Sequence, residues 1–291
     1  MKIKIKAAAK INLFLDILGR LPNGYHSLFM LMQSVSLFDE LEIKLCQSKK
    51  VEISSNTKSL PTDEENIAFK AALAFFEATG LKNEGIAIHV EKKIPLSAGL
   101  AGGSADAAAV LQGLNTLYKE PLTKTQLLKT GLKVGSDVPF CLQGGTMLVQ
   151  DTGGVMSRLP DLPGCFIVLA KPHGGVSTLE AYKAYDNFPY IRHPKGPLML
   201  HYATSSRDLR EIFKHAGNVF EQCIEVPDRV EIKRIMRKYS PICSQMTGSG
   251  PTVFAIFQDE EAACNCAREL EGVAQSTHVC QPTRKSIEIN F

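Results

Sequence analysis

The sequence lacks tryptophan, and aromatic residues of all kinds make up only 7% of its 291 positions. It also lacks an apolar run near the roughly 20 residues that a membrane-spanning helix needs. Its first residues, MKIKIKAAAKINLFLDI, alternate lysine with isoleucine and lack the continuous apolar block of a secretory signal. We therefore expect a cytoplasmic protein that makes no contact with a membrane.

Cysteine and histidine are present without the spacing of a metal site or a disulfide framework. The eight cysteines contain no Cys-x-x-Cys pair, and the seven histidines form no His-Glu-x-x-His pattern. We expect most of the thiols to be reduced and buried. A dense lysine and arginine run is also lacking, and the net charge is only +3. Nucleic acid is therefore not an expected partner, whereas a small anionic ligand is compatible with this charge.

The chain has enough length and apolar content for two domains. It is 44% hydrophobic and 22% charged, which is ordinary for a globular protein with a large core. The turn Asp-Thr-Gly-Gly at residues 151–154 marks the predicted boundary, so the domains are 1–154 and 155–291. Strands alternate with amphipathic helices in the second half, which predicts an α+β fold.

Hydrophobic periodicity and breaker residues predict the individual elements. Residues 2–17 are expected to form an edge or half-buried strand, and residues 187–206 to be irregular. The other expected elements are two short strands within 38–54, a helix carrying Tyr182 and Tyr185, helices at 67–78, 123–133, 209–224, 230–238 and 259–270, and strands at 85–90, 144–150, 166–170, 253–257 and 277–280.

The most informative stretch is residues 92–118, KKIPLSAGLAGGSADAAAVLQGLNTLY, in which a glycine-rich turn leads directly into a helix. Gly99, Gly102 and Gly103 free the backbone from Cβ sterics, and Ser104 is a natural N-cap. The loop amides and the positive end of the helix dipole then face one point, which suits a phosphate. A turn built for tight packing would use the same glycines. The spacing is neither a Walker A motif nor the dinucleotide fingerprint.

Three other residues have both a structural and a chemical interpretation. From composition alone, Lys10 on the first strand is a solvated surface lysine. Asp137, within Gly-Ser-Asp-Val-Pro-Phe, is as well suited to an N-cap as to a functional carboxylate. Tyr25 follows the turn at residues 19–24 and is either a packing residue or a stacking platform.

Taken together, these segments resemble the GHMP kinases. Their three motifs correspond here, in order, to Lys-Ile-Asn-Leu from Lys10, to residues 95–109, and to Thr-Gly-Ser-Gly-Pro-Thr at 247–252. The second motif of that superfamily reads Pro-x-x-x-Gly-Leu-x-x-Ser-Ser-Ala. This chain departs from it at Ala105, where the second serine is usual, and at Ala101, which is often glycine. These departures leave the backbone donors in place but put a role for a second serine hydroxyl in doubt.

More narrowly, four segments resemble the 4-diphosphocytidyl-2-C-methyl-D-erythritol kinases. They are Ala-Lys-Ile-Asn-Leu at 9–13, Asn-Gly-Tyr-His at 23–26, residues 94–109, and residues 135–140. The resemblance implies phosphorylation of the 2-hydroxyl of a cytidine-diphosphate-linked methylerythritol, with ATP and Mg²⁺, in the non-mevalonate route to isoprenoids. It also implies an N-terminal domain like ribosomal protein S5 domain 2, a ferredoxin-like C-terminal domain, and a monomer or homodimer.

The resemblance further implies a role for each matching residue. Asp137 is expected to take the proton of the acceptor hydroxyl, and the charge of Lys10 to keep that carboxylate ionised and to orient the hydroxyl. Ser104 is expected to touch Mg²⁺, and Asn66 to contact adenine. The expected phosphate-binding residues are Pro95, Leu96, Ser97, Ala98, Gly99, Leu100, Ala101, Gly102, Gly103, Ser104 and Ala105. The expected substrate-binding residues are Asn12, Tyr25, His26, Tyr182, Gly248 and Gly250, with Tyr25 and Tyr182 stacking on cytosine. The alternatives are a core packing role for Tyr182 and a turn at 248–250 that braces the first loop.

Two alternatives remain at this stage. The same fold can phosphorylate another small alcohol, such as homoserine or mevalonate, but Asn-Gly-Tyr-His favours a pyrimidine because a small polyol needs no stacking ring. A non-catalytic nucleotide- or RNA-binding module is the second alternative. The weak net charge and the presence of both Lys10 and Asp137 count against it.

Overall fold

A computed structural model describes residues 1–290 and contains, within them, two β-sheets. Its strands are β1 (Lys2–Arg20), β2 (His26–Leu45), β3 (Val51–Ser55), β4 (Ile86–Glu91), β5 (Thr146–Asp151), β6 (Val155–Arg158), β7 (Phe166–Lys171), β8 (Cys243–Met246), β9 (Val253–Phe257), β10 (Ser276–Cys280) and β11 (Ile287–Asn290). The larger sheet has the order β11-β1-β2-β4-β3, with β5 paired to β2 and β6 to β5. The smaller sheet has the order β10-β7-β9-β8.

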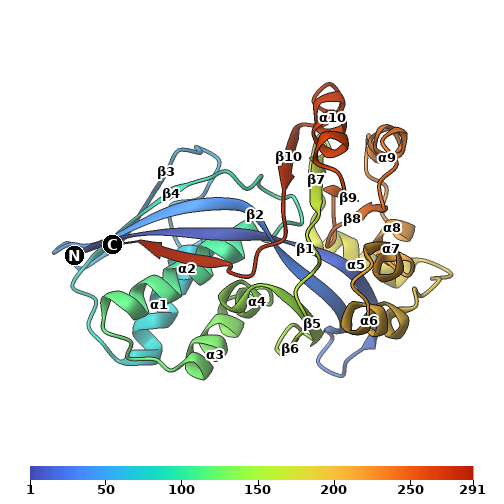
Figure 1. The fold of residues 1–291 in the computed structure, drawn as a ribbon. Coiled ribbons are helices and arrows are strands. Elements are labelled where there is room, and N and C mark those ends of the chain that lie inside the picture. Colours follow the sequence, from blue (N-terminus) through green and yellow to red (C-terminus); the bar gives the residue numbers. More distant parts are fainter. Residues whose placement is uncertain (291) are drawn as a thin grey trace.

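Helices cover parts of both sheets (Figure 1). They are α1 (Ile67–Thr79), α2 (Gly102–Leu117), α3 (Lys124–Val134), α4 (Val138–Gln143), α5 (Thr178–Asn187), α6 (Gly196–Ser205), α7 (Leu209–Phe213), α8 (Phe220–Cys223), α9 (Arg229–Lys238) and α10 (Glu260–Leu270). Helices α1 to α4 lie together beneath the larger sheet, α9 and α10 stand beside the smaller one, and α5 to α8 gather at the opposite end from the chain termini.

The long hairpin of β1 and β2 crosses the whole molecule (Figure 1). Its antiparallel register runs from Lys2 opposite Lys44 to Arg20 opposite His26, with three irregularities along β1. Such bulges bend and twist a strand pair. The hairpin can therefore belong to the larger sheet near the termini and still reach the helices at the far end.

The expectation of an edge or half-buried first strand is wrong. Strand β1 lies between β2 and β11, and every residue from Ala7 to Ile17 is buried. Helix α2 packs on it so closely that a Cβ at Gly113 would lie 2.4 Å from the Ile5 side chain. Further along, Asn12 and Leu13 are covered by Gln245, which donates to both of their carbonyl oxygens. Lys10 is accordingly only 4% exposed and is not a solvated lysine.

Local sequence signals set the ends of several helices. Asn66 caps α1 by accepting from the Ala68 N–H, and Gly80 ends that helix in a left-handed conformation. Thr123 and Gln126 form a capping box for α3, close to the predicted helix. The predicted N-cap role of Ser104 is wrong. Helix α2 already begins at Gly102, because Ala101 takes the left-handed conformation that turns the loop into the helix.

The smaller sheet has its own apolar layer. Val168 and Ala170 of β7 pack with Ile232 and Met236 of α9 and with Leu270 of α10. All strand pairs in this sheet are antiparallel. The α+β architecture with two packed units is therefore confirmed.

Five elements were not predicted. Helix α4 follows Asp137, α6 falls in the region expected to be irregular, and β6, β8 and β11 are short strands of four residues each. Two of them lie after the predicted domain boundary but belong to the larger sheet, because β6 pairs with β5 and β11 pairs with β1. The division at residue 154 stays a prediction, and the sheets themselves do not separate at that residue.

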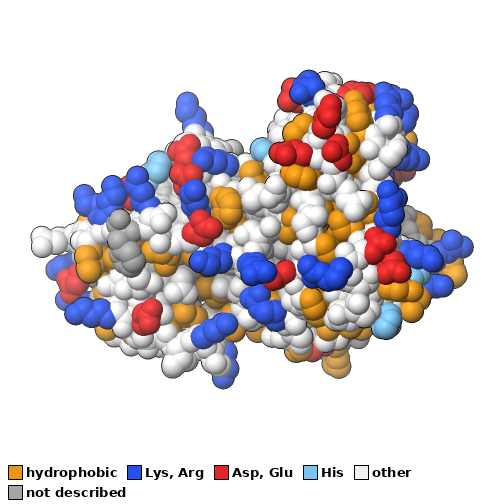
Figure 2. All heavy atoms as spheres, in the orientation of Figure 1, with side chains coloured by type: hydrophobic (Ala, Val, Ile, Leu, Met, Phe, Trp, Pro, Cys, Tyr) orange, Lys and Arg blue, Asp and Glu red, His pale blue; other side chains and the backbone are white. Residues whose placement is uncertain are grey.

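Two surface properties bear on the expected partners. No helix within residues 1–290 has the length and apolar character needed to cross a membrane. On the face shown in Figure 2, lysine and arginine side chains are interspersed with aspartate and glutamate over most of the surface. This face therefore presents no continuous basic stripe. The absence of a nucleic-acid partner stays a prediction.

Candidate functional site

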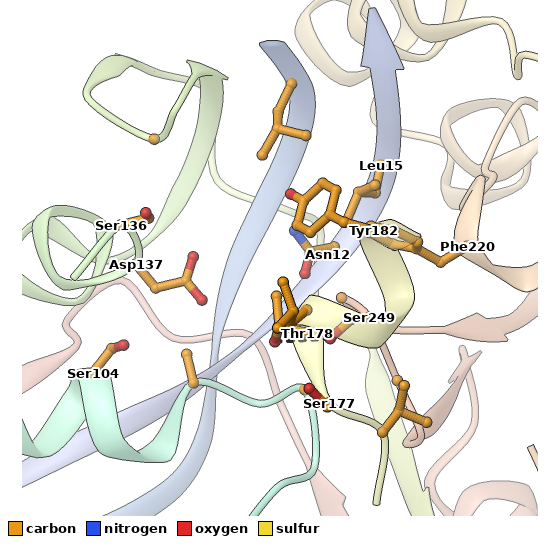
Figure 3. Close-up of a pocket in the computed structure, with 18 of the residues that line it drawn as sticks. Asn12, Leu15, Ser104, Ser136, Asp137, Ser177, Thr178, Tyr182, Phe220 and Ser249 are labelled. Carbon is orange, nitrogen blue, oxygen red and sulfur yellow. Dashed lines mark hydrogen bonds between the residues drawn. The ribbon is translucent and has the colours of Figure 1, made fainter. Parts of the chain in front are cut away.

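A cavity of about 1090 Å³ lies where the two halves of the chain meet. Its walls come from β1, from the loop at 95–101 with the start of α2, from the residue before α4, from α5, and from the turn at 248–250. In Figure 3 the side chains of Asn12, Asp137 and Thr178, contributed by three of these segments, converge on one space. The cavity is large enough for a nucleotide and a second small molecule.

Lys10 and Asp137 meet at the centre of this cavity. The Lys10 Nζ lies 3.4 Å from the Asp137 Oδ2, and it donates to the Asn12 Oδ1 at 2.8 Å. The lysine side chain is only 5% exposed, whereas that of Asp137 is 32% exposed. Asp137 stands at the N-cap position of α4, but its side chain makes no capping hydrogen bond. Its carboxylate is therefore free to interact with a ligand that enters the cavity.

Asn12 is held rigidly beside Lys10. Its backbone N–H donates to the Thr247 hydroxyl at 2.9 Å, and its side-chain amide donates to the Met30 sulfur at 3.3 Å. Strand residues two apart point to the same face, so Lys10 and Asn12 present their side chains together. The first predicted motif thus provides a cation and an amide that are already positioned.

The predicted phosphate loop runs along one wall of the cavity, and residues 95–104 all line it. The first amides of α2 have no acceptor within the helix and carry the positive end of its dipole. Ser97, Gly99 and Ala101 all have positive φ angles, so the chain turns sharply before the helix starts. Gly102 and Gly103 do not, since they already belong to α2. Glycine at these positions lets the start of α2 pack closely on its neighbours, because a Cβ at Gly103 would lie 3.1 Å from the Ile67 side chain.

The second glycine-rich turn packs directly on the first. A Cβ at Gly99 would lie 2.6 Å from the Thr247 carbonyl oxygen and 2.8 Å from that of Gly250. A Cβ at Gly248 would lie 3.1 Å from the Gly99 carbonyl oxygen and 3.5 Å from the Lys10 Nζ. The turn at 248–250 therefore braces the phosphate loop and also borders the centre of the cavity.

The far end of the cavity is built from rings. His26 stacks on Tyr182 with their ring centroids 4.7 Å apart, and Phe220 meets Tyr182 edge-on. The His26 Nε2 lies 2.8 Å from the Asp186 Oδ1. Burial, aided by the negative charge of Asp137, raises the pKa of Tyr182 to about 12. Tyr25 also borders this end and is 64% exposed, so much of its surface is accessible to a ligand.

Known protein families and relatives match both halves of the chain. The GHMP kinases N terminal domain family matches residues 66–145, and the GHMP kinases C terminal family matches residues 202–274. The 4-diphosphocytidyl-2-C-methyl-D-erythritol kinase of Clostridium tetani is 38% identical over 280 residues, which cover 95% of this chain and 99% of that protein. The Exiguobacterium sibiricum protein of the same name is 41% identical over 283 residues, 96% and 97% of the two chains.

The chain belongs to the 4-diphosphocytidyl-2-C-methyl-D-erythritol kinase family of GHMP kinases. The fold agrees with this, because a crystal structure of a 4-(cytidine 5'-diphospho)-2C-methyl-D-erythritol kinase superposes with a TM-score of 0.79 at 28% identity, over 96% of this chain and 98% of the other. A homoserine kinase from Cytophaga hutchinsonii, at 21% identity and a TM-score of 0.78 over 99% and 97% of the chains, shares the fold. The predicted family and enzyme class, an ATP-dependent small-molecule kinase, are confirmed.

Two predicted site residues of this kinase do not line the cavity. Asn66 is buried, and its side chain is engaged by the Ala68 N–H and the Pro61 carbonyl oxygen. Its position therefore gives no support to the expected adenine contact. Ala105 is 1% exposed and lies one residue inside the part of α2 that borders the cavity. The roles expected of the other site residues stay predictions, although the structure brings all of them to the cavity wall.

Sequence reasoning missed several residues that border the same cavity. The hydroxyl oxygens of Thr178 and Ser249 lie 3.3 Å apart. Figure 3 marks this hydrogen bond with a dashed line. Asp186, which contacts His26, follows Tyr182 by four residues on α5 and so faces the same side of that helix. That spacing was a usable signal for Asp186. Ser136 and Ser249 lie within the motifs at 135–140 and 247–252 but were given no role there. Ser177 and Thr178 carried no signal, since isolated hydroxyl residues are common.

A buried ionic cluster lies behind the phosphate loop. The Lys92 Nζ donates to the Asp106 Oδ2 at 2.7 Å and also to the Asp39 Oδ2, and all three side chains are at most 3% exposed. Burial raises the pKa of Asp106, against the attraction of Lys92. Burial alone would lower the pKa of Lys92, but Asp106 and Asp39 hold it above its usual value. Neither Lys92 nor Asp106 was singled out from the sequence.

We expect Gly99→Ala to destabilise the protein, because the new Cβ would meet the Thr247 carbonyl oxygen at 2.6 Å and the residue would keep a φ of +73°. The free energy of unfolding should fall by about 2 kcal/mol or more. Gly164→Ala is the matched control, since no atom lies within 4 Å of its Cβ position. Urea denaturation of both variants measures the difference, and equal stability would show that the two glycine-rich turns do not constrain each other.

Proposed function

We propose that this chain transfers the γ-phosphate of ATP to the 2-hydroxyl of 4-diphosphocytidyl-2-C-methyl-D-erythritol, giving the 2-phosphate and ADP in the non-mevalonate route to isoprenoid precursors. The observation that carries the proposal is the placement of Lys10 and Asp137, 3.4 Å apart, between the phosphate loop and the ring-lined end of one cavity. The names of the relatives support this choice of substrate. A cytoplasmic location and a monomeric or homodimeric state stay predictions.

ATP and Mg²⁺ suit the residues that are present. The phosphates would lie against the amides of residues 99–104, where the α2 dipole favours negative charge. No group of three or more histidine, cysteine, aspartate or glutamate side chains able to hold a metal occurs within residues 1–290. This agrees with Mg²⁺, which is usually held by substrate phosphates, water and one or two side chains. Ser104 would be one of those side chains, and the ion would neutralise phosphate charge.

The reaction asks little covalent chemistry of the protein. A new bond forms between the 2-oxygen of the acceptor and the γ-phosphorus, the bond from that phosphorus to the β–γ bridging oxygen breaks, and ADP leaves. The hydroxyl proton passes to the Asp137 carboxylate as the new bond forms. Lys10, fixed by Asn12 at 2.8 Å, orients the hydroxyl and balances the charge of Asp137.

The ring-lined end would take the cytidine. Tyr25 offers an open face for stacking, and His26 presents its polar edge beside it. The His26 Nε2 is engaged by the Asp186 carboxylate at 2.8 Å, so Nδ1 is the ring nitrogen left for the base. Tyr182, already stacked on His26, would form the inner wall of this subsite.

The alternatives are separated by one assay. Homoserine and mevalonate have no aromatic ring that could stack at the ring-lined end of the cavity. An RNA-binding module would not need the buried Lys10–Asp137 pair. Coupled ADP release should be rapid with the cytidylated substrate and near background with homoserine or mevalonate. Faster turnover of either small alcohol would overturn the proposed acceptor. ATP binding without turnover of any of the three would overturn the kinase proposal.

Asp137→Asn should fold normally and still bind ATP, because the residue makes no capping hydrogen bond. Its kcat should fall roughly 10²-fold or more, which is the scale of losing a general base. Steady-state kinetics together with calorimetric titration of an ATP analogue check both points. A kcat near that of the wild type would remove Asp137 from the mechanism.

Lys10→Met should lower kcat because a neutral side chain neither orients the hydroxyl nor balances the carboxylate. We expect a fall of about tenfold to hundredfold, the scale of mispositioning near the reacting atoms. Lys6→Met is the matched control, since Lys6 lies on the same strand and is exposed. An equal effect of the two substitutions on kcat, or a change confined to the melting temperature, would contradict a catalytic role for Lys10.

Tyr25→Ala should raise KM for the cytidylated substrate by about ten- to hundredfold, since a lost stacking face costs roughly 1–3 kcal/mol and 1.4 kcal/mol is one decade. KM for ATP should change little, and Tyr25→Phe should be mild because stacking needs the ring alone. Tyr190→Ala controls for loss of an exposed tyrosine that does not border the cavity. A rise in KM for ATP alone would place Tyr25 at the wrong end of the site.

A further inference from the structure

The cluster of Asp39, Lys92 and Asp106 joins both ends of the phosphate loop. Asp39 lies on β2, Lys92 follows β4 at the entrance of the loop, and Asp106 lies in the first part of α2 at its exit. Lys92 bridges the two carboxyl groups, at 2.7 Å from the Asp106 Oδ2. The three residues are between 0% and 9% exposed, so solvent does not compete for these contacts.

Asp39 also fixes the backbone of the entrance. Its Oδ1 accepts from the Lys93 N–H at 2.6 Å and from the Ile94 N–H at 2.8 Å. The exit lies against the same segment, because a Cβ at Gly102 would be 3.0 Å from the Ile94 Cγ2 and 3.2 Å from the Lys92 Nζ. The position of the first α2 amides therefore depends on where Lys92 and Ile94 lie.

We propose that Asp39, Lys92 and Asp106 are positioning residues that hold the phosphate loop and the start of α2 in the arrangement that binds the ATP phosphates. This inference rests on the proposed function only in assigning ATP to the loop. A buried ion pair is often no more stabilising than apolar side chains of similar volume. Its retention here is explained by geometry, since one ammonium group ties a strand, a loop entrance and a helix to one point.

The neighbouring lysines provide a matched pair of variants. Lys92 is buried in the cluster, whereas the Lys93 side chain is 51% exposed and pairs with Glu40 at the surface. Lys92→Met should weaken binding of a non-hydrolysable ATP analogue about tenfold to hundredfold, because displaced amides no longer converge on the phosphates. Lys93→Met should leave the dissociation constant within about twofold, as expected for an exposed pair.

Asp106 provides a second pair that keeps the shape of the side chain. Asp106→Asn retains an oxygen that accepts from Lys92, whereas Asp106→Leu has a similar outline and no acceptor. We expect Asn to preserve affinity for the ATP analogue and Leu to weaken it as Lys92→Met does. In both weakened variants KM for the acceptor should change less than about twofold, because the ring-lined end is remote from the cluster. The double variant Lys92→Met/Asp106→Leu serves where Lys92→Met alone does not fold.

Calorimetric titration, steady-state kinetics and thermal melting together test the inference. The expected result is a raised dissociation constant and KM for ATP, with an unchanged KM for the acceptor, in variants that melt cooperatively. Unchanged affinity for the ATP analogue in folded Lys92→Met or Asp106→Leu would overturn it. So would a parallel rise of both KM values with a lowered melting temperature, which is the pattern of a purely structural role. Failure of the proposed function would look different, because the wild type would then bind the analogue without phosphorylating the cytidylated acceptor.

Discussion

One short segment of β1 holds both glycine-rich turns. The Lys10 N–H donates to the Leu100 carbonyl oxygen of the phosphate loop at 3.1 Å, and the Asn12 N–H donates to the Thr247 hydroxyl of the second turn at 2.9 Å. The side chains of the same two residues face the cavity. The backbone of β1 therefore positions the loops while its side chains supply the polar groups between them, and a shift of this strand would move all of these parts together.

The burial of Lys10 is offset by its two polar partners. An ammonium group removed from water is costly unless it is paired and hydrogen-bonded. Asn12 and Asp137 satisfy this need at 2.8 and 3.4 Å, so the cost of burial itself keeps the aspartate at the centre of the site. Asp137 retains partial exposure toward the cavity, which a carboxylate needs if it is to reach a ligand. The contacts that stabilise the charge of Lys10 are thus the same contacts that hold Asp137 in position.

Much of this could be predicted from the sequence, and the failures have physical causes. Glycine spacing before a helix predicted the phosphate loop, and helix ends such as Gly80 followed their local signals. The first strand was placed at an edge because alternation of Lys2, Lys4 and Lys6 with isoleucine describes only its beginning. Beyond Ala7 every residue to Ile17 is buried. The strand's partners are more than 90 residues away in the sequence: α2 packs on it at Ile5, and Gln245 donates to the Asn12 and Leu13 carbonyl oxygens. Ser104 failed as an N-cap because Ala101 adopts a left-handed conformation that alanine rarely takes.

The same reasoning explains which site residues were found. Lys10, Asn12 and Asp137 belong to contiguous motifs, whereas Lys92 and Asp106 carried no signal of their own, and only the fold brings Lys92 between Asp106 and Asp39. The phosphate end of the cavity rests on a long helix and a central strand, and the ring-lined end on a hairpin tip and α5. Rigid elements suit the step common to all GHMP kinases, phosphoryl transfer, while loops and short helices suit the part of the site that must distinguish acceptors.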